Sequence, residues 1–113
     1  MIDILNRRDK RTHGQRAEKK AASRLGAVLT PGSGAIQGMK GDFRTATFMV
    51  ENKSTVNASL SLKKDWLEKI AREALDHGKS PALFLQFVNA SGESNVDDRW
   101  VMIREIDFQG MIE

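Results

Sequence analysis

Cysteine is absent from the 113 residues, and histidine and proline each occur only twice. A chain without cysteine can form neither a disulfide framework nor a thiolate zinc site, which fits a reducing, cytoplasmic setting. Long apolar runs are absent as well: the longest lie near residues 81–85 and 100–103, whereas a membrane-spanning helix needs roughly 20 apolar residues. The N-terminal residues are charged and no apolar core follows them. We therefore expect neither a membrane partner nor a secretory signal.

The length suits one small domain with a single core. The net charge is only +3, but eight positive charges and two negative ones lie between residues 7 and 24. The eight are Arg7, Arg8, Lys10, Arg11, Arg16, Lys19, Lys20 and Arg24. Such a segment favours a polyanion such as DNA, because each phosphate that it neutralises releases counterions. The alternative is a solvated basic helix.

The N-terminal third divides into an arm and a helix. Residues 1–12 are polar with little periodicity, so we expect a flexible basic arm there, followed by one domain over residues 13–113. Small apolar residues recur at three- and four-residue steps from residue 14 to residue 25, which predicts a helix with a narrow apolar face. Gly26 would end this helix. Val28 and Leu29 begin an extended segment, and proline and glycine predict a loop at residues 30–34.

Two strands are expected next, one near residues 35–37 or 42–44 and a second, more clearly indicated by its apolar residues, at residues 45–54. A second, amphipathic helix follows over residues 62–75, with Ser61 as its N-cap and Gly78 as its stop. The apolar run at residues 81–88 predicts a central strand covered on both faces. Residues 99–104 predict a further strand that pairs with it as a hairpin. This order of helix, strands, helix and strands predicts an α/β fold in which helices flank a mixed β-sheet.

The candidate chemistry lies on and beside the strand at residues 45–54. Side chains alternate along a strand, so Phe48 and Val50 would share one face, and Glu51 and Lys53 the other. A short ribbon from Asp42 could return its carboxylate beside them. Two carboxylates are hard oxygen ligands suited to Mg²⁺, and an ammonium group can stabilise charge or position a water. Taken singly, each feature also fits an ordinary turn or a solvated surface pair.

Seven segments, in order, resemble the archaeal-type Holliday junction resolvases of the PD-(D/E)XK nuclease superfamily. They are GQRAE at residues 14–18, GSG at 32–34, GD at 41–42, VENKST at 50–55, the amphipathic helix, PALFLQF at 81–87 and RWVMI at 99–103. The similarity covers nearly the whole chain from residue 14 to residue 104. It implies a restriction-endonuclease-like fold for residues 13–113.

The resemblance also implies roles for individual residues. The glutamate of the first helix, the aspartate of the second strand and the Glu-x-Lys pair of the third correspond to Glu18, Asp42, Glu51 and Lys53. The functional serine of the glycine-serine loop corresponds to Ser33. Asp42, Glu51 and Glu18 would hold Mg²⁺, which Mn²⁺ could replace, and Lys53 would orient the attacking water. DNA would be contacted by Arg7, Arg8, Lys10, Arg11, Arg16, Lys19, Lys20, Ser33 and Lys40.

The function implied is a Mg²⁺-dependent endonuclease that resolves four-way DNA junctions in a bacterial or archaeal cytoplasm, with a bacteriophage origin suggested by the small size. A nuclease of the same fold that nicks, repairs or restricts other DNA is one alternative, and a non-catalytic nucleic-acid-binding protein is another. Two symmetric cuts require two active sites, so we expect a homodimer. Trp66 or Trp100 and the second helix would supply its apolar contacts, unless both tryptophans belong to the core. His13 and His77 are expected at the surface.

Overall fold

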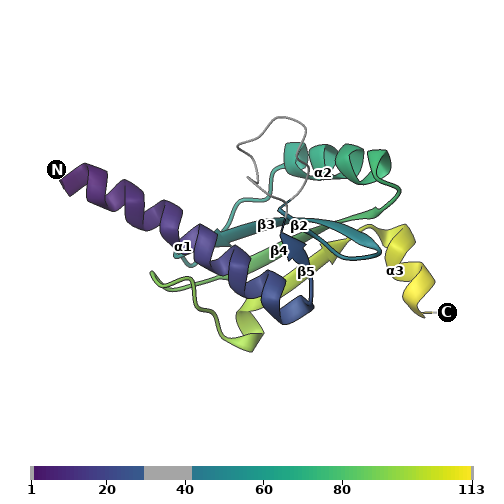
Figure 1. The fold of residues 1–113 in the computed structure, drawn as a ribbon. Helices are drawn as coiled ribbons and strands as arrows, with labels where there is room; N and C mark the ends of the chain where they lie inside the picture. The colour runs from purple at the N-terminus through teal and green to yellow at the C-terminus, as the bar shows by residue number, and fades with distance from the viewer. Residues whose placement is uncertain (1, 30–41, 113) are drawn as a thin grey trace.

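The computed structural model describes residues 2–29 and 42–112 (Figure 1). Three α-helices and five strands occur in this part of the chain. They are α1 (Ile2–Leu25), β1 (Val28–Leu29), β2 (Phe43–Arg44), β3 (Phe48–Thr55), α2 (Lys64–Asp76), β4 (Ser80–Phe87), β5 (Arg99–Ile103) and α3 (Glu105–Ile112), with a short 3₁₀ turn at Val96–Asp98 before β5.

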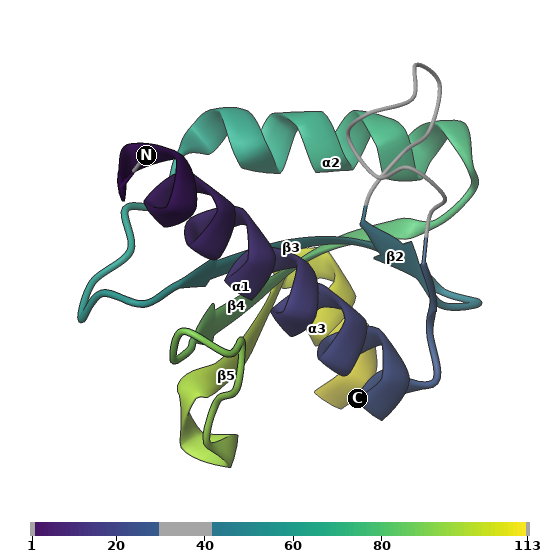
Figure 2. The same ribbon diagram turned by 60° about the vertical axis from the view of Figure 1, so that its left-hand side comes forward.

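The described strands form one mixed sheet in the order β1-β2-β3-β4-β5. The neighbours β1 and β2, β2 and β3, and β4 and β5 pair antiparallel, whereas β3 and β4 pair in parallel. Parallel neighbours need a crossover connection, which α2 supplies. Helix α1 packs on one face of the sheet and α2 on the other (Figure 2). The prediction of an α/β fold with a mixed sheet flanked by helices is therefore confirmed.

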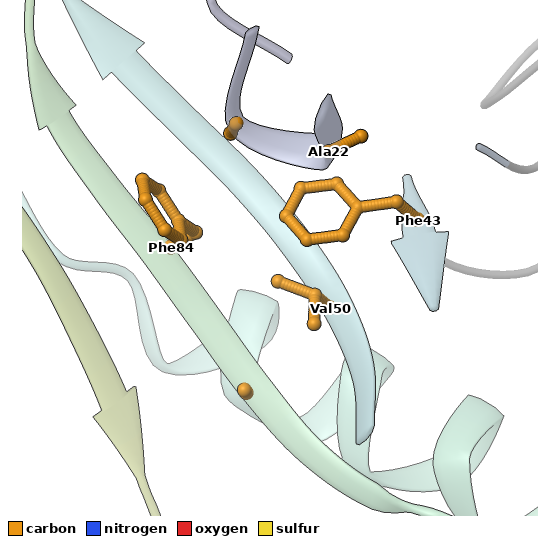
Figure 3. Close-up of a cluster of buried hydrophobic side chains, with 6 residues drawn as sticks. Ala22, Phe43, Val50 and Phe84 are labelled. Atoms are coloured by element: carbon orange, nitrogen blue, oxygen red, sulfur yellow. The ribbon is translucent and has the colours of Figure 1, made fainter. Parts of the chain in front are cut away.

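The layer beneath α1 is built on small helix residues and large sheet residues. Ala21 and Ala22 of α1 are buried against Phe43, Val50 and Phe84 (Figure 3). The rings of Phe43 and Phe84 meet edge to face with their centroids 6.2 Å apart, which is a favoured aromatic geometry. Because alanine has a short side chain, the helix can approach the sheet closely. The predicted small-residue face of this helix is confirmed.

The layer beneath α2 uses larger side chains. Ile70 and Ala74 of α2 pack on Met49 of β3 and Leu83 of β4, with Trp66, Leu67, Leu85 and Met102 around them. Alternate residues of β4 thus enter opposite layers, which confirms the prediction of a central strand covered on both faces.

Two details of α2 differ from expectation. The helix begins at Lys64 and its N-cap is Lys63, not Ser61, and no side chain caps it. The Lys63 backbone is extended, so the helix does not continue into the residues before it. The Lys63 carbonyl accepts the Trp66 N–H at 3.1 Å and so begins the first turn. Leu75, an apolar residue of the predicted amphipathic helix, is 79% exposed, because it lies in the last turn, beyond the edge of the core.

Both long helices end at the predicted glycines. Gly26 and Gly78 have φ of 63° and 64°, a region that L side chains rarely adopt. The N–H of Ala27 donates to the Ala22 carbonyl at 2.9 Å, and that of Lys79 donates to the Ala74 carbonyl at 2.8 Å. These are the bonds of a Schellman motif, which satisfies carbonyls at a helix end.

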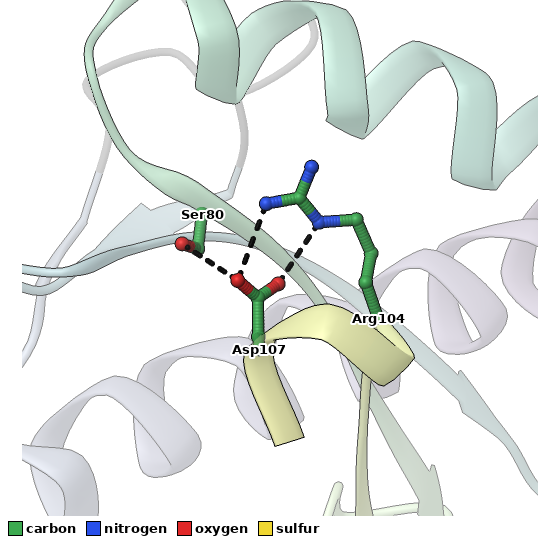
Figure 4. Close-up of polar contacts among 3 residues, drawn as sticks. All are labelled: Ser80, Arg104 and Asp107. Carbon is green, nitrogen blue, oxygen red and sulfur yellow. Dashed lines mark hydrogen bonds and ion pairs between the residues drawn. The ribbon is translucent and has the colours of Figure 1, made fainter. Parts of the chain in front are cut away.

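The two ends of the chain differ from the predicted layout. Helix α1 runs from Ile2 without a break at the predicted boundary between residues 12 and 13, and the role of residues 1–12 as a DNA-binding arm stays a prediction. Helix α3 was not predicted. The Arg104 guanidinium donates to Asp107 at 2.9 and 3.2 Å, and the Ser80 hydroxyl donates to the same carboxylate at 3.2 Å, which ties α3 to the start of β4 (Figure 4). The loop at 30–34 and the strand option at 35–37 lie outside the described residues.

Candidate functional site

The β2–β3 hairpin brings Asp42 beside Glu51. Phe43 of β2 pairs with Val50 of β3, and Asp42 directly precedes Phe43. The Asp42 N–H donates to the Val50 carbonyl at 2.8 Å, and its Oδ2 accepts the Asn52 N–H at 2.6 Å. The Asp42 carboxylate is thereby bonded to the stretch of β3 that carries Glu51. The expectation that a short ribbon returns Asp42 to this strand is confirmed.

Glu51 and Lys53 lie next to one another on β3. The Lys53 Nζ is 3.5 Å from Glu51 Oε2, and the two side chains are 28% and 15% exposed. The same Nζ lies 4.5 Å from the centroid of the Trp66 ring on α2. A cation over an aromatic face is attracted by the ring quadrupole, so Trp66 and Glu51 together hold the ammonium group on the α2 side of the sheet. Met49 of the same strand is buried in the α2 layer and Val50 in the α1 layer, as predicted.

Glu18, on α1, lies close enough to Asp42 and Glu51 for their charges to act on its carboxyl group. Burial, reinforced by the negative charges of Asp42 and then Glu51, raises the pKa of Glu18 to about 7. Burial also raises the pKa of Glu51, and Asp42 adds to that effect while Lys53 and Lys69 oppose it. Close carboxylates disfavour one another's ionised forms. The three predicted acidic residues therefore lie within electrostatic reach of each other, although they come from three separate elements.

The donor chemistry of the site suits a hard divalent cation. Asp42 and Glu51 supply carboxylate oxygens, the ligands that Mg²⁺ prefers, and their mutual repulsion is what a cation would relieve. Within residues 14–28 and 42–112, no three histidine, aspartate or glutamate side chains are grouped closely enough to hold a metal. Glu18 is thus not joined to Asp42 and Glu51 as a third direct ligand in this structure, and its expected role as a metal ligand stays a prediction.

Other predicted contact residues fall in different places. Arg16, Lys19 and Lys20 are exposed on α1, where they could meet a polyanion. Arg7, Arg8, Lys10 and Arg11 belong to the first half of the same helix. Ser33 and Lys40 lie within residues 30–41, outside the described part of the chain. His77 is exposed at the end of α2, as predicted, and its Nδ1 is 2.9 Å from the Glu73 carbonyl oxygen.

Sequence reasoning missed Gln86 on β4. This side chain is 1% exposed and forms hydrogen bonds to residues of α1, β3 and the loop before β5. The available signal was its position as the one strongly polar residue in the apolar run 81–88. The alternation expected along this strand turns Asn52 away from Glu51 and Lys53, and Asn52 Oδ1 accepts from Gln86 Nε2 at 2.7 Å.

Comparison with known proteins gives no relative: no protein-family model, curated protein or solved structure matches this chain. In the described residues, none of the helices combines the length and apolar character needed to cross a membrane.

Proposed function

We propose that this protein is a Mg²⁺-dependent DNA endonuclease that resolves four-way junctions. The observation that carries the proposal is the β2–β3 hairpin, in which the Asp42 carboxylate bonds to the Asn52 N–H, between Glu51 and Lys53, and Glu51 forms an ion pair with the Lys53 ammonium group. Glu18 lies in electrostatic contact with the same pair. A protein that only binds DNA gains nothing from acidic groups collected near phosphate, because like charges repel.

The restriction-endonuclease-like fold is part of the proposal. The resemblance to junction resolvases calls for a glutamate on the first helix, an aspartate on the second strand and Glu-x-Lys on the third. In this chain Glu18 lies on α1, Asp42 directly precedes β2, and Glu51 and Lys53 lie on β3. The agreement between the sequence motifs and these elements supports the assignment.

The reaction is hydrolysis of a phosphodiester, in which a water oxygen bonds to phosphorus, a phosphorus–oxygen ester bond breaks, and the departing oxygen takes up a proton. Asp42 and Glu51 would hold Mg²⁺, which when bound supplies charge neutralisation and a more acidic water. Lys53, placed between Glu51 and the Trp66 ring, would orient the attacking water and offset the charge that develops on the phosphate. Glu18, whose carboxyl group lies within electrostatic reach of Asp42 and Glu51, would complete the outer side of the metal site, either directly or through a water.

Binding of the DNA backbone would use α1. Arg16, Lys19 and Lys20 are exposed on the helix that also carries Glu18, so cations border the acidic site. Phosphate contacts of this kind fix orientation without reading sequence. The basic residues of the first half of α1 would extend the same contact along the duplex.

A homodimer completes the proposal, because two symmetric cuts need two sites in fixed relation. Trp66, one expected contact, packs against the α2 layer, whereas Trp100 is 62% exposed on β5. Within the described residues β5 pairs only with β4, and a groove between β5 and α3 is lined mainly by apolar residues such as Val101, Ile103 and Phe108.

A second copy of this chain suits the free edge of β5. Two copies of one strand can pair antiparallel about a two-fold axis, which gives a self-complementary interface. Such pairing centred on Val101 would set Asp98, just before β5 in one copy, opposite Arg104, just after β5 in the other. These charges are opposite in sign, so the arrangement favours the antiparallel dimer if Arg104 is shared between Asp107 of its own copy and Asp98 of the other.

The proposed activity is tested by cleavage of a four-way junction, a Y-fork and a linear duplex built from the same sequences, with Mg²⁺ and with EDTA. We expect Mg²⁺-dependent cleavage of the junction in preference to the other two. Asp42→Asn and Glu51→Gln should each abolish cleavage and keep or tighten junction binding, because charge repulsion with phosphate is relieved. Asp97→Asn, in the exposed 3₁₀ turn, serves as the matched control.

The outcomes separate the alternatives. Equal cutting of duplex and junction would favour a nuclease of the same fold with another substrate. DNA binding without cleavage under any divalent cation would favour a non-catalytic binding protein. Full activity of Asp42→Asn or Glu51→Gln would refute the site assignment.

A further inference from the structure

Gln86 is a buried amide whose hydrogen-bonding capacity is fully used. It lies on the central strand β4 and is 1% exposed. Its Nε2 donates to Asn52 Oδ1 at 2.7 Å and to the Ala17 carbonyl at 3.4 Å. Its Oε1 accepts from Arg24 Nη2 at 3.0 Å and from Ser94 Oγ at 3.4 Å. A primary amide has two donors and two acceptor lone pairs, so all four are engaged.

Two of these partners are direct chain neighbours of the candidate site. Ala17 is the residue before Glu18 on α1. Asn52 stands between Glu51 and Lys53 on β3, and its own N–H donates to Asp42 Oδ2 at 2.6 Å. One NH₂ group therefore joins the helix that carries Glu18 to the strand segment that carries the remaining site residues.

The bonds link elements that are far apart in the sequence. The contact from Gln86 to Ala17 spans 69 positions in sequence and the one to Asn52 spans 34. The hydrophobic cluster beneath α1 is apolar packing of Ala21 and Ala22 against the sheet, which is non-directional. Directional hydrogen bonds in a buried setting fix a helix along its axis, where alanine contacts alone permit sliding.

We propose that Gln86 is a positioning residue for the site, which sets α1 and Glu18 relative to Asp42, Glu51 and Lys53 through its NH₂ group. The kinetic consequence of this inference rests on the proposed nuclease function. The positional effect of Gln86 does not depend on that function. Gln86 touches no reacting atom and acts through Ala17 and Asn52. Misplacement of catalytic groups by about 1 Å can cost about 100-fold in rate.

The test compares changes on the two sides of the same amide. Gln86→Met has similar length and removes every bond, and Asn52→Ala removes the 2.7 Å bond from the other partner in case the first variant does not fold. Ser94→Ala is the matched control, because it removes a bond to Gln86 Oε1 on the side away from Ala17 and Asn52. Cleavage of the four-way junction is measured at saturating substrate, well below each variant's Tm, together with junction Kd.

We expect Gln86→Met and Asn52→Ala to lower kcat by about 10- to 100-fold with Kd changed by less than about threefold, whereas Ser94→Ala keeps the wild-type kcat. The double variant should be no slower than Gln86→Met alone, because Gln86→Met already removes the bond that Asn52→Ala removes. A merely structural role would lower Tm in all three variants and leave kcat unchanged. That result would overturn the proposal.

Amide hydrogen exchange supplies a second readout that does not depend on nuclease activity. The Asn52 N–H, bonded to Asp42, should exchange at least about tenfold faster in Gln86→Met than in Ser94→Ala, if the amide holds β3 and its neighbours in place. If the wild-type protein cuts no DNA, the proposed function fails and this exchange ratio alone decides the role of Gln86. Equal exchange of Asn52 in both variants would refute the positioning role.

Discussion

Replacing Glu18 by glutamine is expected to stabilise the protein at pH 8 when no divalent cation is present. The carboxyl group of Glu18 has its pKa raised from 4.5 to about 7 by burial and by the charges of Asp42 and Glu51. The folded protein therefore prefers the protonated form more strongly than the unfolded chain does. Ionising Glu18 consequently costs stability, and glutamine, which keeps the shape without the charge, avoids that cost.

The pH window follows from the sign of this shift. Below about pH 4.5 the carboxyl group is protonated in both states and the cost is absent. The cost grows as pH rises towards 7 and is fully present above it. One pKa unit corresponds to about 1.4 kcal/mol, which sets an upper bound of about 3 kcal/mol. Since Glu18 is partly exposed to solvent, we expect about 1–2 kcal/mol after screening.

Urea unfolding of wild type and Glu18→Gln across pH 4 to 8, in EDTA, measures the difference directly. The two free energies of unfolding should agree near pH 4 and diverge to about 1–2 kcal/mol by pH 8. Glu93→Gln, which removes an exposed carboxylate in the loop before β5, should show no comparable divergence. Millimolar Mg²⁺ should narrow the gap if the carboxylates bind it. A constant gap at all pH values, or a less stable Glu18→Gln at pH 8, would refute the reasoning.

Three further predictions concern cleavage, binding and assembly. Lys53→Ala should lower the cleavage rate by at least about 100-fold with little change in junction Kd, and a wild-type rate would remove Lys53 from the mechanism. Neutralising the basic residues Arg7, Arg8, Lys10 and Arg11 of α1 should weaken binding to all DNA structures alike and flatten the salt dependence of that binding. A loss of binding confined to one DNA sequence would contradict this. Trp100→Ser should convert a dimer to a monomer, as measured by light scattering at micromolar concentration. Val96→Ser should leave the dimer intact, because Val96 is also exposed but lies outside the groove. A monomeric wild-type protein would contradict the proposed interface.

The sheet and its covering helices were predictable because their signals are local. Glycines with the left-handed conformation end α1 and α2 where the sequence suggested, and the apolar run at residues 81–88 is the buried central strand. Alternation along β3 correctly assigned Val50 and Met49 to opposite layers. Each of these features depends on residues within one element and its immediate flanks.

The errors arise where distant contacts decide the outcome. Helix α3 begins after Arg104, and no serine, threonine, asparagine or aspartate precedes it as an N-cap signal. The Asp107 side chain of this helix accepts a hydrogen bond from Ser80, which belongs to β4. The role of Gln86 depends on Ala17, which is 69 positions away. The raised pKa of Glu18 likewise depends on burial and then on the charges of Asp42 and Glu51, which are distant in the sequence. Single-sequence patterns carry no information on such pairings.

The different spans of the site contacts have a consequence for the order of folding. Asp42 and Glu51 belong to a hairpin and are nine positions apart, whereas the bond between α1 and Gln86 closes a span of 69. Loop-closure entropy grows with the logarithm of length, which makes the longer closure costlier by about 2 kcal/mol. We expect the contact between Asp42 and β3 to form with the early hairpin, and the bond between α1 and Gln86 to form later. Transient undocking of α1 would then withdraw Glu18 while Asp42 stays bonded to β3.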